Sequence, residues 1–103
     1  MADTWTKVAA EGAVPDDGML PVYPRGLGVL LVKAGGTVYA VANRCAHMAC
    51  PLEAGARDGF VITCPCHDWR FDVRTGEFLD ASEVRLAVYP VRSENGKLFI
   101  NLG

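Results

Sequence analysis

The sequence predicts a small all-β domain, and three observations support this fold class. Short runs rich in Val, Leu and Tyr have the composition of strands, no segment keeps a helical period, and Gly, Pro and Asn separate the runs at intervals typical of short strands. The chain has 103 residues, which is within the size range of one domain. We therefore expect a single domain covering residues 1–103, built from antiparallel strands.

A β-hairpin in the first half of the chain is the strongest local signal. Leu27–Lys33 and Thr37–Ala42 flank Ala34-Gly35-Gly36, whose glycines can adopt the positive φ angles of a tight turn. Pro21 confines the run around it to the edge of a sheet, because proline cannot donate to a hydrogen-bonded ladder. The other expectations in this half are a strand at Trp5–Val8, a polar loop at Glu11–Gly18 and an edge strand at Met19–Tyr23.

The second half of the chain is divided into shorter segments. Asn95-Gly96 separates the alternating run Val84–Arg92 from Lys97–Leu102, and this dipeptide predicts another hairpin. The other expectations here are a loop at Leu52–Gly59, a strand at Phe60–Thr63, a strand at Trp69–Val73, a turn at Arg74–Glu77 and an irregular segment at Phe78–Ser82. Seven aromatic residues are expected to serve the core rather than function: Trp5, Tyr23, Tyr39, Phe60, Phe71, Tyr89 and Phe99.

The composition excludes several classes of function. The net charge is −2 and the ten Lys and Arg residues are scattered, so we expect no nucleic-acid partner. The amino terminus lacks the pattern of a secretory signal, and the longest apolar stretch, Gly28–Val32, is too short to span a membrane. Neither a Ser/His/Asp set nor a phosphate-binding glycine loop is present, so we expect no catalysis and no small-molecule substrate of its own. The sequence predicts a soluble cytoplasmic protein without membrane insertion.

All four cysteines and both histidines lie within residues 44–72. They form two short loops, Cys45-Ala-His47-Met-Ala-Cys50 and Cys64-Pro-Cys66-His67, and each loop follows a predicted strand. The cytosol keeps most thiols reduced, so metal ligation is favoured over a disulfide framework. Zinc is one interpretation, although each loop mixes a cysteine with a histidine where zinc sites usually bring two cysteines, and zinc leaves two cysteines unexplained. Haem attachment needs C-x-x-C-H, which is absent.

The arrangement C-x-H…C-x-x-H resembles the site of the Rieske 2Fe-2S family. The resemblance implies one 2Fe-2S cluster, with Cys45 and Cys64 on the inner iron and His47 and His67 on the outer iron. It also implies the Rieske fold, a small β-sandwich or barrel-like base with a cluster-binding subdomain of two loops at about residues 43–72. A zinc-stapled interaction module remains the alternative, which iron and sulfide analysis would exclude.

The two further cysteines and the second loop refine the resemblance. In Rieske subunits of quinol-oxidising complexes, cysteines at the positions of Cys50 and Cys66 form a disulfide between the loops, and two buried free thiols are the alternative here. Those subunits continue with G-S-x-Y, whose hydroxyls raise the reduction potential. This chain has Asp68-Trp69-Arg70-Phe71 instead, which is closer to Rieske proteins of aromatic-ring oxygenase systems. A low to middle Rieske potential is therefore expected.

The resemblance implies a soluble Rieske-type ferredoxin, a one-electron carrier between a reductase and a terminal oxygenase or another acceptor. A small Rieske subunit of a larger oxidoreductase is the alternative. An apolar collar around the cluster is also expected, and its residues could serve partner docking or loop packing equally well: Met48, Pro51, Leu52, Pro65 and Trp69.

Overall fold

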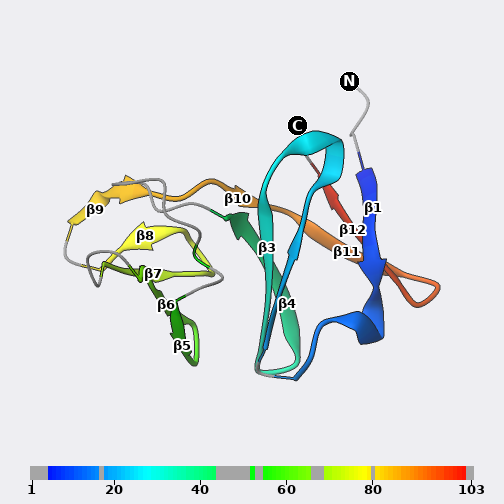
Figure 1. Cartoon of the computed structure of the whole chain (residues 1–103), viewed down its shortest axis with the longest axis horizontal. Coiled ribbons are helices and arrows are strands. Elements are labelled where there is room, and N and C mark those ends of the chain that lie inside the picture. Colours follow the sequence, from blue (N-terminus) through cyan, green and yellow to red (C-terminus); the bar gives the residue numbers. More distant parts are fainter. Residues whose placement is uncertain are drawn as a thin grey trace.

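A computed structural model describes residues 5–16, 18–43, 52, 55–65, 69–79 and 81–101. These residues form antiparallel strands, and the helical segments among them are two short 3₁₀ turns, η1 (Glu11–Ala13) and η2 (Pro24–Gly26). The expected all-β fold class is confirmed (Figure 1). In the described part of the chain, no helix has the length and apolar character needed to cross a membrane.

The strands of the described residues form three antiparallel sheets. The first base sheet has the order β1-β12-β11, the second base sheet β10-β4-β3-β2, and the outer sheet β5-β6-β7-β8-β9. Figure 1 shows β3 and β4 between the strands of the first base sheet and those of the outer sheet. The bounds are β1 Trp5–Ala10, β2 Met19–Val22, β3 Val29–Ala34, β4 Thr37–Ala42, β5 Ala56–Asp58, β6 Val61–Thr63, β7 Arg70–Asp72, β8 Glu77–Phe78, β9 Ala81–Arg85, β10 Val88–Tyr89, β11 Val91–Glu94 and β12 Lys97–Asn101.

Strand β3 is buried on both faces, and this explains the arrangement of the layers. Successive side chains of a strand point to opposite faces. Val29 and Leu31 belong to an inner core between the two base sheets, whereas Leu30 and Val32 belong to an outer core that faces the outer sheet. A strand covered on both sides has a continuous apolar sequence rather than an alternating one. The apolar run at residues 28–32 is therefore the wall shared by the two cores.

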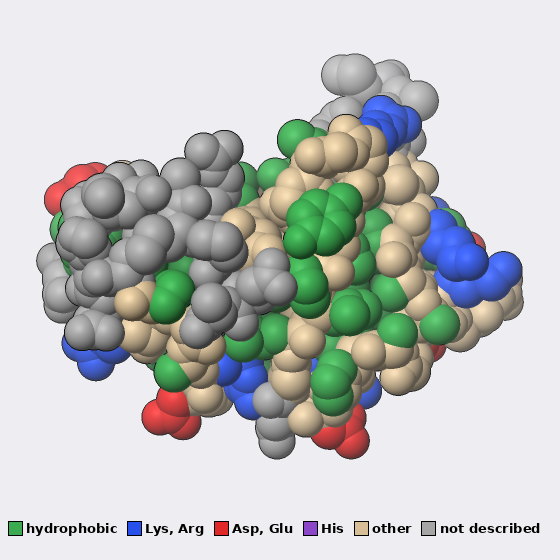
Figure 2. Space-filling model, in the orientation of Figure 1, with side chains coloured by type: hydrophobic (Ala, Val, Ile, Leu, Met, Phe, Trp, Pro, Cys, Tyr) green, Lys and Arg blue, Asp and Glu red, His purple; other side chains and the backbone are tan. Residues whose placement is uncertain are grey.

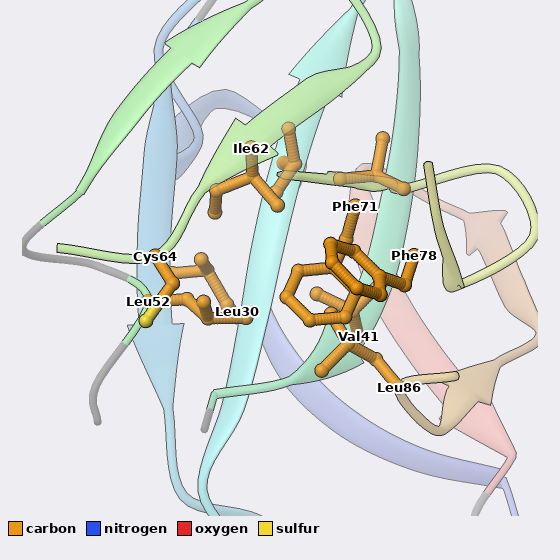
Figure 3. Packing of buried hydrophobic residues seen from close by; sticks show 10 residues of the cluster. Leu30, Val41, Leu52, Ile62, Cys64, Phe71, Phe78 and Leu86 are labelled. Carbon is orange, nitrogen blue, oxygen red and sulfur yellow. The ribbon is translucent and has the colours of Figure 1, made fainter. Parts of the chain in front are cut away.

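The two cores have different compositions. The inner core lies between the two base sheets. Its buried members are aliphatic: Val14, Val29, Leu31, Ala40, Leu98 and Ile100. The outer core joins the second base sheet to the outer sheet and includes aromatic rings and a cysteine (Figure 3). Its buried members are Leu30, Val32, Val41, Leu52, Ile62, Cys64, Phe71, Val73, Phe78 and Leu86.

Both predicted hairpins are present. Gly35 and Gly36 join β3 to β4 with φ angles of 60° and 81°, and Asn95 and Gly96 join β11 to β12 with φ angles of 52° and 75°. Two consecutive positive φ angles are the signature of the tight turn that favours glycine and asparagine. The edge strand around Pro21 is also confirmed, because β2 pairs with β3 alone at the end of its sheet.

Three sequence-based expectations in the outer sheet and its surroundings are wrong. Residues 56–58, expected in a loop, form strand β5, and residues expected to be irregular form β8 and the start of β9. The alternating run Val84–Arg92 is divided among β9, β10 and β11. These strands are two to five residues long. Such short segments carry too little periodicity to be recognised from the sequence. Strands β5, β8 and β9 pair with neighbouring segments of the chain, whereas β10 pairs with the distant β4.

The expectation that all seven aromatic residues lie in the core is wrong for Tyr23. Its ring is 63% exposed, whereas Phe71 is fully buried. Tyr23 follows Val22, the last residue of β2 that pairs with β3, so the sheet ends before it. Leu27, at the other end of the same turn, is also exposed. The remaining five aromatic residues are partly buried.

Candidate metal centre

The structure describes four of the residues that the sequence singled out. They are Cys64, Leu52, Pro65 and Trp69, and all four flank or support the two Cys/His loops. The other predicted ligands, disulfide partners and collar residues lie outside the described residues: Cys45, His47, Met48, Cys50, Pro51, Cys66 and His67. The geometry of the candidate site is therefore built from the segments that deliver these residues.

Strand β4 delivers the first loop. It ends at Ala42, and the N–H of Asn43 donates to the carbonyl of Gly28 at 3.0 Å. The N–H of Ala42 donates to the carbonyl of Ala87 at 2.9 Å. Chain segments on two sides thus hold the backbone immediately before Arg44, as the predicted delivery of the loop by a hairpin requires.

Strands β6 and β7 deliver the second loop. Thr63 pairs with Arg70. One position nearer the loop, the Cys64 N–H donates to the Trp69 carbonyl at 2.7 Å. Cys64 and Trp69 thus form the base of the loop that contains His67. The backbone ladder fixes both ends of this loop.

The Cys64 side chain is fully buried in the outer core. Leu30 and Leu52 belong to the same core and are also fully buried (Figure 3). Within the described residues Cys64 has no disulfide partner. A bare thiolate in apolar surroundings is costly, whereas a thiolate bound to ferric iron has its charge offset at the sulfur. A buried cysteine at a loop base, without a disulfide partner in the described part of the chain, therefore fits the ligand of a soft metal centre.

The Trp69 side chain packs against another aromatic ring of the outer sheet. Its ring stacks on that of Phe78 with 4.2 Å between centroids and 7° between planes, and Phe71 lies at a tilt against Phe78 at 5.6 Å. Leu52 has no exposed surface, whereas Pro65 is exposed. Of the described collar residues, Leu52 and Trp69 thus serve packing, and Pro65 remains available at the surface. Sequence reasoning missed Phe78, whose strand has only two residues.

A charged pair closes the turn after β7. The Arg74 Nε and Nη2 atoms donate to Asp72 Oδ1 at 3.0 Å and Oδ2 at 2.8 Å, and the Arg74 guanidinium lies 4.2 Å from the centre of the Phe60 ring. The side-chain hydrogen bonds from Arg74 hold the pKa of the Asp72 carboxyl below its ordinary value. Phe60 also meets Tyr39 edge to face at 5.9 Å. This contact joins the outer sheet to β4.

Charged side chains are distributed around the molecule. On the face in Figure 2, the blue and red side chains of the described residues lie around the rim, and hydrophobic side chains lie in the middle. Several cations are paired, for example Lys33 with Asp16 at 3.0 Å and Arg92 with Glu94 at 3.0 Å. Among the described residues, four large hydrophobic ones are exposed, and sequence reasoning had placed none of them at the surface: Tyr23, Leu27, Leu79 and Val88.

Comparisons with known proteins place these features in context. The model of the Rieske [2Fe-2S] domain family matches residues 4–90. The ferredoxin component of a naphthalene 1,2-dioxygenase system from Pseudomonas aeruginosa is 34% identical over 99% of both chains. A chain in the complex of reduced oxygenase and oxidised ferredoxin of carbazole 1,9a-dioxygenase has a TM-score of 0.84 at 31% identity, over 94% of this chain and 92% of that one.

The terminal oxygenase of a carbazole 1,9a-dioxygenase from Novosphingobium sp. KA1 also resembles this structure. The TM-score is 0.90 at 28% identity, and 96% of this chain is covered. The chain spans 30% of the length of that oxygenase chain. The same fold thus occurs both as a separate small chain and within a larger one.

Proposed function

The chain belongs to the Rieske [2Fe-2S] domain family, and on that premise we propose that it is a ferredoxin carrying single electrons from a reductase to a terminal oxygenase. The observation that supports this most directly is its end-to-end similarity to the ferredoxin component of a naphthalene 1,2-dioxygenase system, over 99% of both chains. In this role the chain is a component of a multicomponent oxidoreductase and has no substrate of its own. Its partners are redox proteins.

Four residues would hold the cluster: Cys45 and Cys64 on one iron, and His47 and His67 on the other. The described residue of this set, Cys64, has the burial and the fixed backbone that a ligand needs. When bound, a Rieske cluster accepts and releases one electron at about −150 to +300 mV. The outer core shields the Cys64 sulfur from water, and the β6–β7 ladder keeps it in place.

The residues around the second loop favour a potential in the low to middle part of that range. Hydrogen bonds to the sulfurs are one of the features that set the potential of such centres. Trp69 and Phe71 have no hydroxyl group, and the rings of both are directed into an aromatic stack with Phe78. A midpoint in the upper part of the range, measured by potentiometric titration, would contradict this assignment.

The proposal includes three further features that the sequence suggests. The chain forms one Rieske domain over residues 1–103, with the ligand-bearing part at about residues 43–72. Cys50 and Cys66 form a disulfide between the ligand loops, which mass measurement after alkylation without reductant would test. The protein acts in the cytoplasm, and Met48, Pro51 and Pro65 are the collar residues assigned to partner contact.

Metal analysis and spectroscopy test the function directly. The purified protein should be red-brown, contain iron and acid-labile sulfide in equal amounts, and give a rhombic EPR signal after reduction. Cys64→Ser should lose the colour, whereas the control Gly12→Ala, at an exposed position with nothing within 4 Å of its Cβ position, should keep it. A colourless protein containing zinc would overturn the proposal.

Electron transfer needs a separate measurement. The reductase and oxygenase encoded nearest to this chain should turn over an aromatic substrate only when the ferredoxin is added, and stopped-flow mixing of the reduced ferredoxin with the oxidised oxygenase should show one electron transferred per chain. Stable co-purification with a large subunit would instead favour the alternative of a permanent small subunit in a larger oxidoreductase.

A further inference from the structure

Gly55 lies on the segment that connects the two ligand loops, and its backbone touches the residues around Cys64. A Cβ atom at this position would overlap the carbonyl oxygen of Thr63 and would lie 3.0 Å from the Thr63 carbonyl carbon. It would also lie 3.2 Å from Cδ of Pro65. Thr63 and Pro65 are the two neighbours of Cys64 in the chain. The connecting segment thus packs backbone to backbone against the root of the second loop.

The connecting segment cannot easily move away from this contact. The Gly55 N–H donates to the Leu52 carbonyl at 2.9 Å, which closes a tight turn. The side chain of Leu52 is fully buried in the same outer core as Cys64. One residue after Gly55, strand β5 begins, and Ala56 pairs with Thr63. The turn is therefore anchored before and after Gly55.

The opposite side of Cys64 is fixed as well. Its N–H donates to the Trp69 carbonyl at 2.7 Å, and the Trp69 ring stacks on Phe78 at 4.2 Å. Cys64 is consequently held between the Gly55 turn and the strand that begins after Trp69. If the Gly55 turn were displaced toward Cys64, the Trp69 side could move away only by breaking the Cys64–Trp69 backbone hydrogen bond or the stack of Trp69 on Phe78.

The geometry points to Gly55 as a positioning residue that sets the separation of the two ligand loops. This inference rests on the proposed function, because it concerns the ligands of the cluster. The chain enters the Gly55 turn from the first loop, with Cys45 and His47, and contacts the second loop at the neighbours of Cys64. Because only a hydrogen fits at this contact, the contact fixes the distance between the connecting segment and the backbone around Cys64. No property of the sequence around Gly55 indicates this role.

Three Gly→Ala variants of the cluster-containing protein test the inference. Gly55→Ala should displace the g values of the reduced EPR signal and shift the midpoint potential. It should also accelerate bleaching by an iron chelator about tenfold, the size typical for loss of support of a metal ligand. Gly12→Ala is the neutral control, because nothing lies within 4 Å of its Cβ position.

Gly18→Ala is the control for destabilisation alone. A Cβ atom there would lie 2.7 Å from Cγ and 2.9 Å from Cβ of Pro15, in the segment before β2 of the base. This variant should lower the denaturant midpoint of unfolding and leave the g values and potential unchanged. If Gly55→Ala leaves both the g values and the potential unchanged, or if Gly18→Ala changes them equally, Gly55 is not a positioning residue.

A milder variant covers the case in which Gly55→Ala does not fold. Leu52→Val shortens the side chain that anchors the turn and should give a smaller displacement of the g values and potential. An unchanged EPR signal and potential in folded Leu52→Val, together with failure of Gly55→Ala to fold, would reject the positioning role. Absence of iron and sulfide from the wild-type protein would reject the proposed function itself, so the two failures are distinguishable.

Discussion

The hairpin β3–β4 and the strands β7 and β8 show how differently the two ends of the molecule are built. Strands β3 and β4 pair along six residues each, from Val29 with Ala42 to Ala34 with Thr37. In the described residues β7 and β8 share one pair, Phe71 with Phe78. A long ladder forms between neighbours in the sequence, whereas a single pair needs side-chain contacts to hold it. The base is thus stabilised mainly by long ladders, including the one between the distant strands β1 and β12, and by aliphatic burial, whereas the ligand-bearing end is stabilised by specific packing.

The difference has a functional meaning. The ligand loops must hold a metal centre in one geometry, and preorganised surroundings provide that rigidity. An aromatic stack, a glycine contact without space for a Cβ atom and a buried thiol supply it in the outer sheet. The base sheets need only to present β4 in a fixed direction. Substitutions in the two regions should therefore separate stability from the properties of the cluster.

The largest loss of stability is expected for Phe78→Ala. The Phe78 ring is 9% exposed and contacts both Trp69 and Phe71, so its removal leaves a cavity in the outer core. We expect the free energy of unfolding to fall by about 3–5 kcal/mol, measured by urea denaturation, together with an altered EPR signal. A normal EPR signal in the folded variant would show that the stack does not position the second loop.

Two neighbouring leucines of β3 allow the cleanest comparison of the regions. Leu30 faces the outer core and Leu31 the inner core, and both are fully buried. Each Leu→Ala substitution should lower the free energy of unfolding by about 3 kcal/mol. Only Leu30→Ala should also weaken retention of iron against a chelator. Equal iron loss in both variants would mean that the two cores are not separable.

A smaller effect is expected at the turn of the first hairpin. Gly36 has a φ angle of 81° with nothing within 4 Å of its Cβ position, so Gly36→Ala introduces backbone strain without a steric clash. The expected loss is about 1–2 kcal/mol in the free energy of unfolding, with no change in midpoint potential. A change in the potential would show that the base hairpin transmits strain to the first ligand loop.

The smallest effect is expected at the charged pair of the β7–β8 turn. Asp72→Asn should cost about 1 kcal/mol or less at neutral pH, because the pair is partly exposed. Hydrogen bonds from Arg74 lower the pKa of Asp72, so its contribution is present above the carboxyl's unfolded pKa and is lost as the pH falls through the lowered value. The stability difference between wild type and variant should therefore shrink below about pH 4. A difference that persists at lower pH would contradict this origin.

The sequence by itself determined the parts of this protein whose interactions are local. Gly35-Gly36 and Asn95-Gly96 dictate their turns through backbone conformation, and the run at residues 28–32 marks a strand by composition alone. The loops with Cys45 and Cys64 are recognisable because few residue types bind iron, and their spacing along the chain carries the family resemblance.

Only the tertiary structure decided the outer sheet and its tight contacts. Strands β5 and β8 form short ladders with the segments next to them in the chain, and burial of Ile62, Phe71 and Phe78 in the outer core accompanies this pairing. The stack of Trp69 on Phe78 joins rings nine positions apart across a turn. The closeness of Gly55 to Thr63 accompanies the pairing of the next residue, Ala56, with Thr63. Burial and pairing between separate segments are cooperative properties of the packed chain, so no local pattern encodes them. The sequence predicts which residues are the ligands, whereas the packing around Cys64 is visible only in the fold.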